Sequence, residues 1–106
     1  MSEILERLSA NIESRKGADA SVSYTASLFN AGEEAILKKV GEEAVEVLLA
    51  AGNQDNRHLV AESADLLFHL MVLLSSRGLA LDDVLNELQR REGVSGHAEK
   101  AARQDS

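Results

Sequence analysis

Hydrophobic residues recur along most of this chain at the three- and four-residue spacing of an α-helix. The pattern predicts four main helices and one short turn: residues 3–15, a turn at 26–29, residues 33–51, residues 57–77, and a last helix that ends at Gly93. Pro is absent, and Leu, Ala and Val supply most of the apolar side chains, a mixture that favours helix. We therefore predict an all-α fold, a helical bundle of about four to five helices in one domain spanning residues 1–106.

Capping residues indicate where these helices begin and end. The expected N-caps are Ser2, Thr25, either Asp55 or Asn56, and Asp82, and the expected stops are Gly17, Gly52, Gly78 and Gly93. Gly41 lies inside the second main helix, where it costs about 1 kcal/mol relative to Ala. It marks either a close approach of another backbone or a tolerated surface position. Residues 94–106 are polar and charged, and we expect them to form a loosely ordered tail.

The third main helix is apolar nearly all round over Leu66–Leu74. Such a helix needs cover on several sides, and 106 residues provide few other helices to supply it. We therefore expect an obligate homodimer in which two subunits complete one core. The run is too short to cross a bilayer, and no N-terminal signal pattern is visible, so we expect a cytoplasmic protein without a membrane partner.

Charge and cysteine content exclude several classes of function. The formal net charge of −7 argues against a nucleic-acid partner, which normally requires a basic patch. The absence of Cys excludes disulfides and thiolate metal sites. An acidic protein can still bind a nucleotide, because a divalent cation can bridge its carboxylates to the phosphates.

Five carboxylates lie where two predicted helices become strongly apolar. They form an E-E-x-x-E motif at Glu42, Glu43 and Glu46, and an E-x-x-D motif at Glu62 and Asp65. Residues three or four apart share a helix face. Glu46 and Glu62 each lie about 9 Å from the turn that joins the two helices, at about 1.5 Å per residue, so in an antiparallel pair the motifs can face each other.

Any one of these glutamates, taken alone, is more often a solvated surface residue than a ligand. The paired motifs favour the functional interpretation, since crowded carboxylates repel one another and lose hydration. A divalent cation stabilises such a cluster, and an all-oxygen set suits Mg²⁺, with Mn²⁺ as a substitute. We therefore predict a divalent-cation site formed by carboxylates of the two motifs.

Two further segments offer groups for a phosphorylated ligand. Lys38 and Lys39 come one turn before the first acidic motif and could neutralise phosphate oxygens. The alternative is a solvated face paired with nearby glutamates. Ser23, Tyr24 and Thr25 place three hydroxyls before a helical turn, where backbone N–H groups can receive anions; the alternative is simple capping by Thr25.

The histidines are less informative than the carboxylates. His69 follows Asp65 by four residues on the same helix face, so it could be a ligand or a base. A His in an apolar helix is more often a hydrogen-bonded core residue, which is the interpretation we favour. His58 and His97 have the surroundings of surface residues.

These segments together resemble a known family. The strings SYTASLFNAGEEAILKKVGEEAVEVLLAA, ESADLLFHLMVLLSSRGLALDDVLNELQRR and GVSGHAEKAAR are similar to phosphoribosyl-ATP pyrophosphatase, from about Leu5 to Arg103. The acidic motifs alone are shared by the wider superfamily of all-α nucleoside-triphosphate pyrophosphatases, which includes MazG-like enzymes and dimeric dUTPases. The SYT segment, together with KKVGEEAVE, narrows the resemblance from this superfamily to phosphoribosyl-ATP pyrophosphatase.

The resemblance implies Mg²⁺-dependent hydrolysis of 1-(5-phosphoribosyl)-ATP to the AMP compound and pyrophosphate, in the second step of histidine biosynthesis, by a homodimeric helical bundle. It implies that Glu43, Glu46, Glu62 and Asp65 hold the metal and that Glu42 is a further ligand or the base. It also implies that Lys39, with Lys38, meets the polyphosphate and that Ser23, Tyr24 and Thr25 line the substrate site. The alternatives are a housecleaning nucleoside-triphosphate pyrophosphatase and a non-catalytic dimerisation module.

Overall fold

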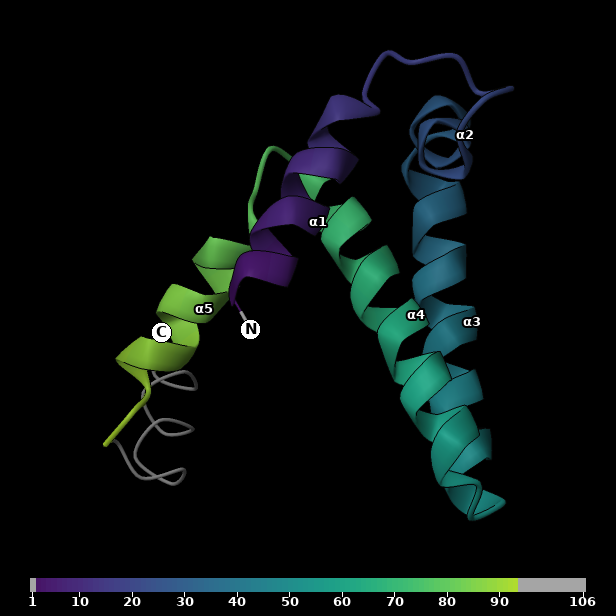
Figure 1. Ribbon diagram of the computed structural model, residues 1–106, viewed down its shortest axis with the longest axis vertical. Coiled ribbons are helices and arrows are strands. Elements are labelled where there is room, and N and C mark those ends of the chain that lie inside the picture. The colour runs from purple at the N-terminus through teal and green to yellow at the C-terminus, as the bar shows by residue number, and fades with distance from the viewer. Residues whose placement is uncertain (1, 94–106) are drawn as a thin grey trace.

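The computed structural model describes residues 2–93, and over that range all of its regular secondary structure is α-helical (Figure 1). The helices are α1 (Ser2–Ser14), α2 (Tyr24–Ala31), α3 (Glu33–Gly52), α4 (Asn56–Ser76) and α5 (Leu81–Arg90). The predicted all-α class and number of helices are confirmed for these residues. The expected tail at 94–106, with His97, lies outside the described residues.

An antiparallel pair of long helices, α3 and α4, dominates the molecule (Figure 1). The two helices are joined by a tight turn in which Gln54 adopts a left-handed backbone with φ 58°. Asp55 begins α4, because its side chain accepts a hydrogen bond of 3.0 Å from the backbone N–H of His58. Of the two predicted caps, Asp55 is therefore the correct one. The short turn forces the helices to run side by side, which sets the register of their side chains.

The cap of α2 differs from the prediction. Ser23, rather than Thr25, caps this helix, and its hydroxyl accepts from the N–H of Ala26 at 3.2 Å. Ser23 has the extended backbone that an N-cap requires (φ −152°, ψ 128°), whereas Thr25 lies inside the first turn and is buried. The expected four-residue turn is thus a two-turn helix that begins one residue after the cap.

The start of α5 also differs from the prediction. The helix begins at Leu81 after an extended Ala80, so Asp82 lies in the first turn and is not the cap. The N–H of Ala80 donates to the Asp83 carboxylate at 2.9 Å. An acidic side chain in the first turn thus bonds back to the cap residue, as in one half of a capping box. Leu81 is free to point into the core, where it is buried.

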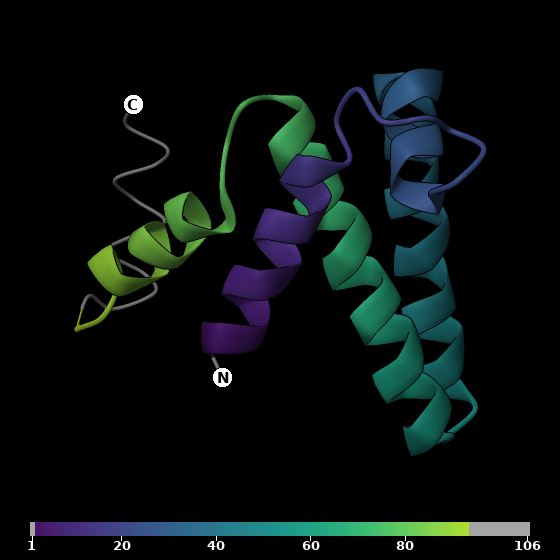
Figure 2. The same cartoon turned by 45° about the horizontal axis from the view of Figure 1, so that its top comes forward.

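The buried core lies where α1 and α2 meet one end of the α3–α4 pair (Figure 2). It is built from aliphatic side chains of all five helices: Ile12, Leu28, Ile36, Met71, Val72 and Leu81. Ile12 and Ile36 were expected at apolar positions and are 1% exposed. Leu37 and Leu48 were expected on the same apolar face but are exposed, because none of the described helices covers α3 at these positions.

Two features of the long helices bear on the earlier alternatives. Gly41 is exposed, and a Cβ added there would meet no atom within 4 Å, so it is a surface glycine and not a point of close approach. Taken whole, α4 is long and apolar enough to pass as a membrane span by length and composition alone, contrary to the expectation from the shorter run. Core helices of globular proteins pass the same test, and α4 carries Glu62 and Asp65 at its centre.

A hydrogen bond between helices ties α1 to α4. The Ser75 hydroxyl, which is buried on α4, donates to the Glu13 carboxylate at 2.7 Å. Lys16 contacts the same carboxylate at 3.0 Å. The Ser75 hydrogen bond first, and then Lys16, lower the pKa of Glu13 from its usual 4.5. Both contacts favour the ionised form of Glu13.

We expect Ser75→Ala to lower the free energy of unfolding in a pH-dependent way. Since the native pKa of Glu13 lies below its unfolded value, the contribution is complete above about pH 4.5 and is lost as the pH falls through the native pKa. Urea denaturation should therefore separate Ser75→Ala from wild type at neutral pH and bring the two together in acid. Ser76→Ala is the control, because its hydroxyl bonds only to the carbonyl of Leu73 within α4. A pH-independent difference for Ser75→Ala would contradict this assignment.

Candidate functional site

Three acidic side chains from α3 and α4 converge at the centre of the helix pair. One carboxylate oxygen from each of Glu43, Glu62 and Asp65 lies within 4.8 Å of the others. Glu62 and Asp65 are three residues apart and therefore share a face of α4, and Glu43 meets them from α3. Glu43 is 9% exposed and Asp65 is open to solvent. The cluster is thus backed by protein on one side and accessible on the other.

A second set of ligand-type atoms adjoins the first. Glu46, His58 and Glu62 also bring one atom each to within 4.8 Å of one another, and Glu62 belongs to both sets. The Nε2 atom of His58 lies 3.0 Å from the Glu62 carboxylate. Glu46 and Glu62 meet because each lies at a similar depth from the hairpin turn, as their spacing predicted. The four predicted metal ligands therefore lie in two adjoining groups, and Glu62 belongs to both.

His58 is a site residue that the sequence reasoning placed on the surface. It is exposed, yet it lies one helical turn before Glu62 and faces the acidic cluster. The H-x-x-x-E spacing was available in the sequence and places both side chains on one helix face. What the sequence could not show is that Glu46 on the neighbouring helix would approach the same pair.

Glu42 and Lys38 lie outside this arrangement. Both are exposed, and Glu42 belongs to neither acidic set among the described residues. Successive helix positions differ by about 100°, so when Glu43 points toward α4 its neighbour points away. Lys39, by contrast, is half-buried and lies 3.5 Å from the Glu43 carboxylate. The structure therefore brings one of the two predicted lysines to the site.

The electrostatics of the site reflect its crowding. A hydrogen bond to Glu43 and then burial raise the pKa of Glu62, while His58 acts in the opposite direction. Two adjacent carboxylates share a proton more readily than they ionise together. The pKa of Lys39 is also raised, first by the phenolic oxygen of Tyr24 and then by Glu43 and Glu42, so Lys39 stays cationic. Close carboxylate oxygens with excess negative charge fit a hard divalent cation.

The SYT segment contributes to the site through Tyr24. Its hydroxyl oxygen lies 2.7 Å from Nε2 of His69, and its ring stacks near Phe68 while remaining half-exposed. His69 is buried, and its Nδ1 lies 2.7 Å from the backbone oxygen of Asp65. The predicted hydrogen-bonded core histidine is therefore confirmed. The Ser23 hydroxyl caps α2 and Thr25 is buried, so of the three hydroxyls Tyr24 has the most exposed side chain.

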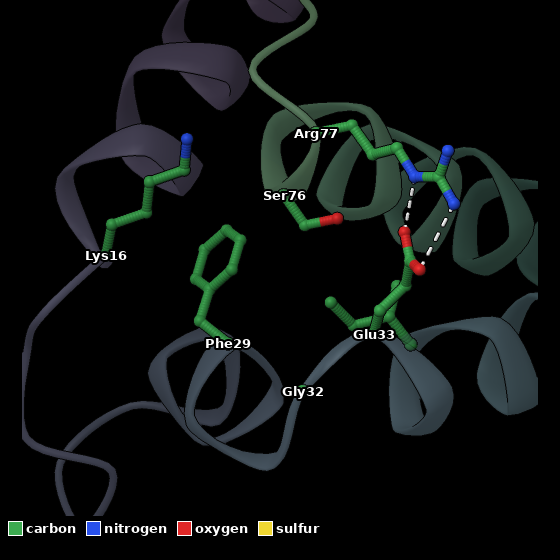
Figure 3. Close-up of a pocket in the computed structure, with 7 residues that line it drawn as sticks. Lys16, Phe29, Gly32, Glu33, Ser76 and Arg77 are labelled. Atoms are coloured by element: carbon green, nitrogen blue, oxygen red, sulfur yellow. Dashed lines mark hydrogen bonds and ion pairs between the residues drawn. The ribbon is translucent and has the colours of Figure 1, made fainter.

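A hollow of about 610 Å³ lies near the start of α3, away from the acidic cluster (Figure 3). Its lining comes from the α1–α2 loop, α2, α3 and the end of α4: Lys16, Phe29, Gly32, Glu33, Ile36, Ser76 and Arg77. Glu33 and Glu43 are ten residues apart, about 15 Å along the helix. Arg77 bonds to the Glu33 carboxylate through two nitrogens, one of them at 3.1 Å. Because the Arg77 guanidinium is already paired with Glu33, it is less available to bind a phosphate in this hollow.

The fold and the site together define an all-α protein with a carboxylate cluster between two antiparallel helices. Residues 5–92 match the family model described as phosphoribosyl-ATP pyrophosphohydrolase. The chain belongs to this family.

Curated relatives are similar to this chain in sequence over almost its whole length. The chain is 56% identical over 99 residues to the phosphoribosyl-ATP pyrophosphatase of Rhodobacter capsulatus, which covers 93% of this chain and 96% of the relative. It is 55% identical over 101 residues to that of Nitrosospira multiformis, with 95% and 84% covered. It is 54% identical over 103 residues to that of Neisseria gonorrhoeae, with 97% and 96% covered. The resemblance inferred from the sequence is therefore confirmed.

Proposed function

We propose that this protein is a magnesium-dependent phosphoribosyl-ATP pyrophosphatase. It hydrolyses the α–β phosphoanhydride of 1-(5-phosphoribosyl)-ATP, so that water adds to phosphorus, the bridging P–O bond breaks and pyrophosphate leaves. This reaction is the second step of histidine biosynthesis. Membership of the family and the names of the relatives support the substrate. The convergence of Glu43, Glu62 and Asp65 is the observation that carries the chemistry.

The acidic residues have distinct roles in this proposal. Glu43, Glu62 and Asp65 would hold Mg²⁺, or Mn²⁺ as a substitute, since an all-oxygen donor set suits both ions. When bound, the cation would neutralise phosphate oxygens and stabilise the charge of the leaving group. Glu46 adjoins this set through Glu62, so it can complete the ligand sphere or accept the proton of the attacking water. Glu42, on the outer face, has no direct role in this arrangement.

The substrate side of the site comes from α2 and α3. Lys39 lies against Glu43 and would bind a phosphate oxygen next to the cation. Tyr24 is half-exposed and its hydroxyl bonds to His69, whereas Ser23 and Thr25 support the position of Tyr24 by capping and packing. A nucleotide of this charge is found inside cells, so the proposed substrate also implies a cytoplasmic location.

We further propose that the protein is a homodimer. The radius of gyration is 16.0 Å, against about 13 Å for a compact domain of this length. Leu48 on α3 and Val60 on α4 are each 70% exposed. Large apolar residues exposed together on one helix pair are unusual on the surface of a monomer. A second copy of the chain would cover them and complete the core that α3 and α4 leave open.

The first test is a substrate panel with Mg²⁺ and with EDTA. We expect pyrophosphate release from phosphoribosyl-ATP to exceed release from ATP, dATP and dUTP, and EDTA to abolish it. The acidic site alone would serve any nucleoside triphosphate, so the preference must come from groups that contact the phosphoribosyl base. Equal rates on all four substrates would favour a housecleaning pyrophosphatase. No turnover, with no Mg²⁺ binding by calorimetry, would favour a non-catalytic module.

Substitution of the acidic residues tests the site itself. We expect Asp65→Asn and Glu46→Gln each to lower kcat by at least about 100-fold, since even partners of metal ligands have effects of 10- to 100-fold. Both changes keep the side-chain shape, so the circular dichroism of the helices should not change. Glu34→Gln is the control, because Glu34 is a glutamate on the same helix as Glu46 and belongs to neither acidic set. Near wild-type turnover in Asp65→Asn at saturating Mg²⁺ would refute the proposed centre.

Sedimentation equilibrium tests the dimer. We expect wild-type protein to sediment as a dimer and Leu48→Asp to sediment as a monomer with a lower Tm, because a buried charge at the interface lacks a partner. Val22→Asp is the matched control, since Val22 is similarly exposed but lies in the loop before α2. A monomeric wild-type protein at micromolar concentration would contradict the proposal, as would dissociation of the Val22→Asp control.

A further inference from the structure

His58 brings a nitrogen atom to the edge of the acidic cluster, and the proposed function gives this residue no role. One ring nitrogen of His58 and one carboxylate oxygen from each of Glu46 and Glu62 lie within 4.8 Å of one another. His58 and Glu62 are one helical turn apart on α4, whereas Glu46 comes from α3. The three donor atoms therefore come from both helices of the pair, and they adjoin the set formed by Glu43, Glu62 and Asp65.

The simplest explanation of His58 is an ion pair on the surface of one helix. Its Nε2 atom lies 3.0 Å from the Glu62 carboxylate, and pairs at this spacing are common on exposed helices and contribute little to stability. That explanation leaves out Glu46. The Glu46 side chain is half-buried, and within the described part of the chain its carboxylate has no hydrogen bond or ion pair. Partial burial of an unpaired carboxylate is unfavourable, so a cation at this position would stabilise Glu46.

The spacing of the donor atoms suits a bound ion. In an octahedral ion with bonds of about 2.1 Å, adjacent donor atoms are about 3 Å apart, which is the separation between Nε2 of His58 and the Glu62 oxygen. Glu46 lies within reach of the same ion after a small rotation of its side chain. A neutral imidazole can carry its one hydrogen on Nδ1, which leaves Nε2 free to bind a cation. His58 is exposed, so an ion and its remaining water ligands have access.

The nitrogen atom distinguishes this donor set from its neighbour. Glu43, Glu62 and Asp65 offer oxygen atoms alone, which suit Mg²⁺. A site that includes an imidazole nitrogen binds first-row transition-metal ions, with an affinity that rises along the series from Mn²⁺. Glu62 has two carboxylate oxygens and can therefore serve both sets.

We propose that Glu46, His58 and Glu62 form a second cation position, in which the His58 nitrogen favours a first-row transition-metal ion such as Mn²⁺ over Mg²⁺. This inference deepens the proposed function and rests on it, because Glu62 would also hold the Mg²⁺ of the pyrophosphatase centre. Ions in two-metal sites lie about 3.5–4 Å apart, so both would be close enough to contact one polyphosphate. The competing interpretation is that His58 only pairs with Glu62.

The nitrogen ligand can be detected without turnover. Electron spin-echo spectroscopy of Mn²⁺ bound to the full-length protein, without nucleotide and at about pH 8, where an ordinary imidazole is neutral, should show coupling to a directly bound ¹⁴N nucleus. His58→Gln should abolish this coupling, since a glutamine can still donate to Glu62 but has no imidazole nitrogen. Arg57→Gln is the matched control: it changes an exposed neighbour on α4 and leaves His58 in place, so the coupling should remain. No coupling in wild type, or coupling that persists in His58→Gln, would overturn the proposal.

Metal affinities measured by calorimetry separate the two positions. We expect His58→Gln and Glu46→Gln each to weaken Mn²⁺ binding at one site by about tenfold or more, as losses of this kind at metal sites do. His58→Gln should leave Mg²⁺ affinity unchanged. Asp65→Asn should weaken the other site and keep the ¹⁴N coupling, because Asp65 belongs only to the all-oxygen set. Equal losses of Mg²⁺ and Mn²⁺ affinity in His58→Gln, or unchanged Mn²⁺ binding in Glu46→Gln, would refute the mixed-donor position.

Failure of this inference is distinguishable from failure of the proposed function. Pyrophosphate release with Mg²⁺, but no ¹⁴N coupling with Mn²⁺, would overturn the second cation position and leave the pyrophosphatase intact. Coupling without pyrophosphate release from any substrate would refute the pyrophosphatase and sustain the cation position. His58 is exposed, so the circular dichroism of His58→Gln should match that of wild type. Should that variant fold poorly, the Mn²⁺ affinity of Glu46→Gln and the wild-type spectrum still decide the question.

Discussion

The packing of α3 against α4 is the constraint on which the rest of the structure depends. A three-residue turn joins two long helices, so they must run antiparallel and in one register. That register sets Glu43 and Glu46 opposite Glu62 and Asp65, and no loop contributes to the arrangement. Sites on rigid helices hold their ligands more accurately than sites on loops. The rigid helix pair therefore holds the like-charged carboxylates close together.

Holding these carboxylates together without a cation is unfavourable, and the protein offsets part of the repulsion. Lys39 approaches Glu43, and His58 approaches Glu62. Hydrogen bonding between Glu43 and Glu62 raises the pKa of Glu62, as is expected where carboxylates are crowded. An excess of negative charge of this kind suits a hard divalent cation, the ligand that we propose for this site. In the proposed function, the same three side chains lower the stability of the fold and bind the cation.

The distribution of the core explains why the chain is expected to pair with a second copy. The buried aliphatic cluster lies at one end of the long helices, where α1, α2 and α5 meet them. Of the described helices, only α3 and α4 reach the other end, and Val45, Leu48, Leu49 and Val60 are exposed there. The acidic site lies between these regions, so the proposed partner subunit, by covering the open end, would also stabilise the helices that carry the acidic cluster. The proposed assembly and the proposed catalysis therefore depend on one hairpin.

Helical periodicity in the sequence determined the fold class and placed the ends of α3 and α4 within one residue, because these signals are local. The sequence also indicated which residues could hold a metal, because the carboxylates within each acidic motif lie at helical spacing. The sequence could not determine the rotation of α3 about its own axis. Only packing against α4 decided that Glu43 faces inward while Glu42 faces solvent, that His58 joins Glu46, and that Gly41 has no neighbour. The bond from Tyr24 to His69 spans forty-five positions, and contacts at that separation depend on tertiary structure.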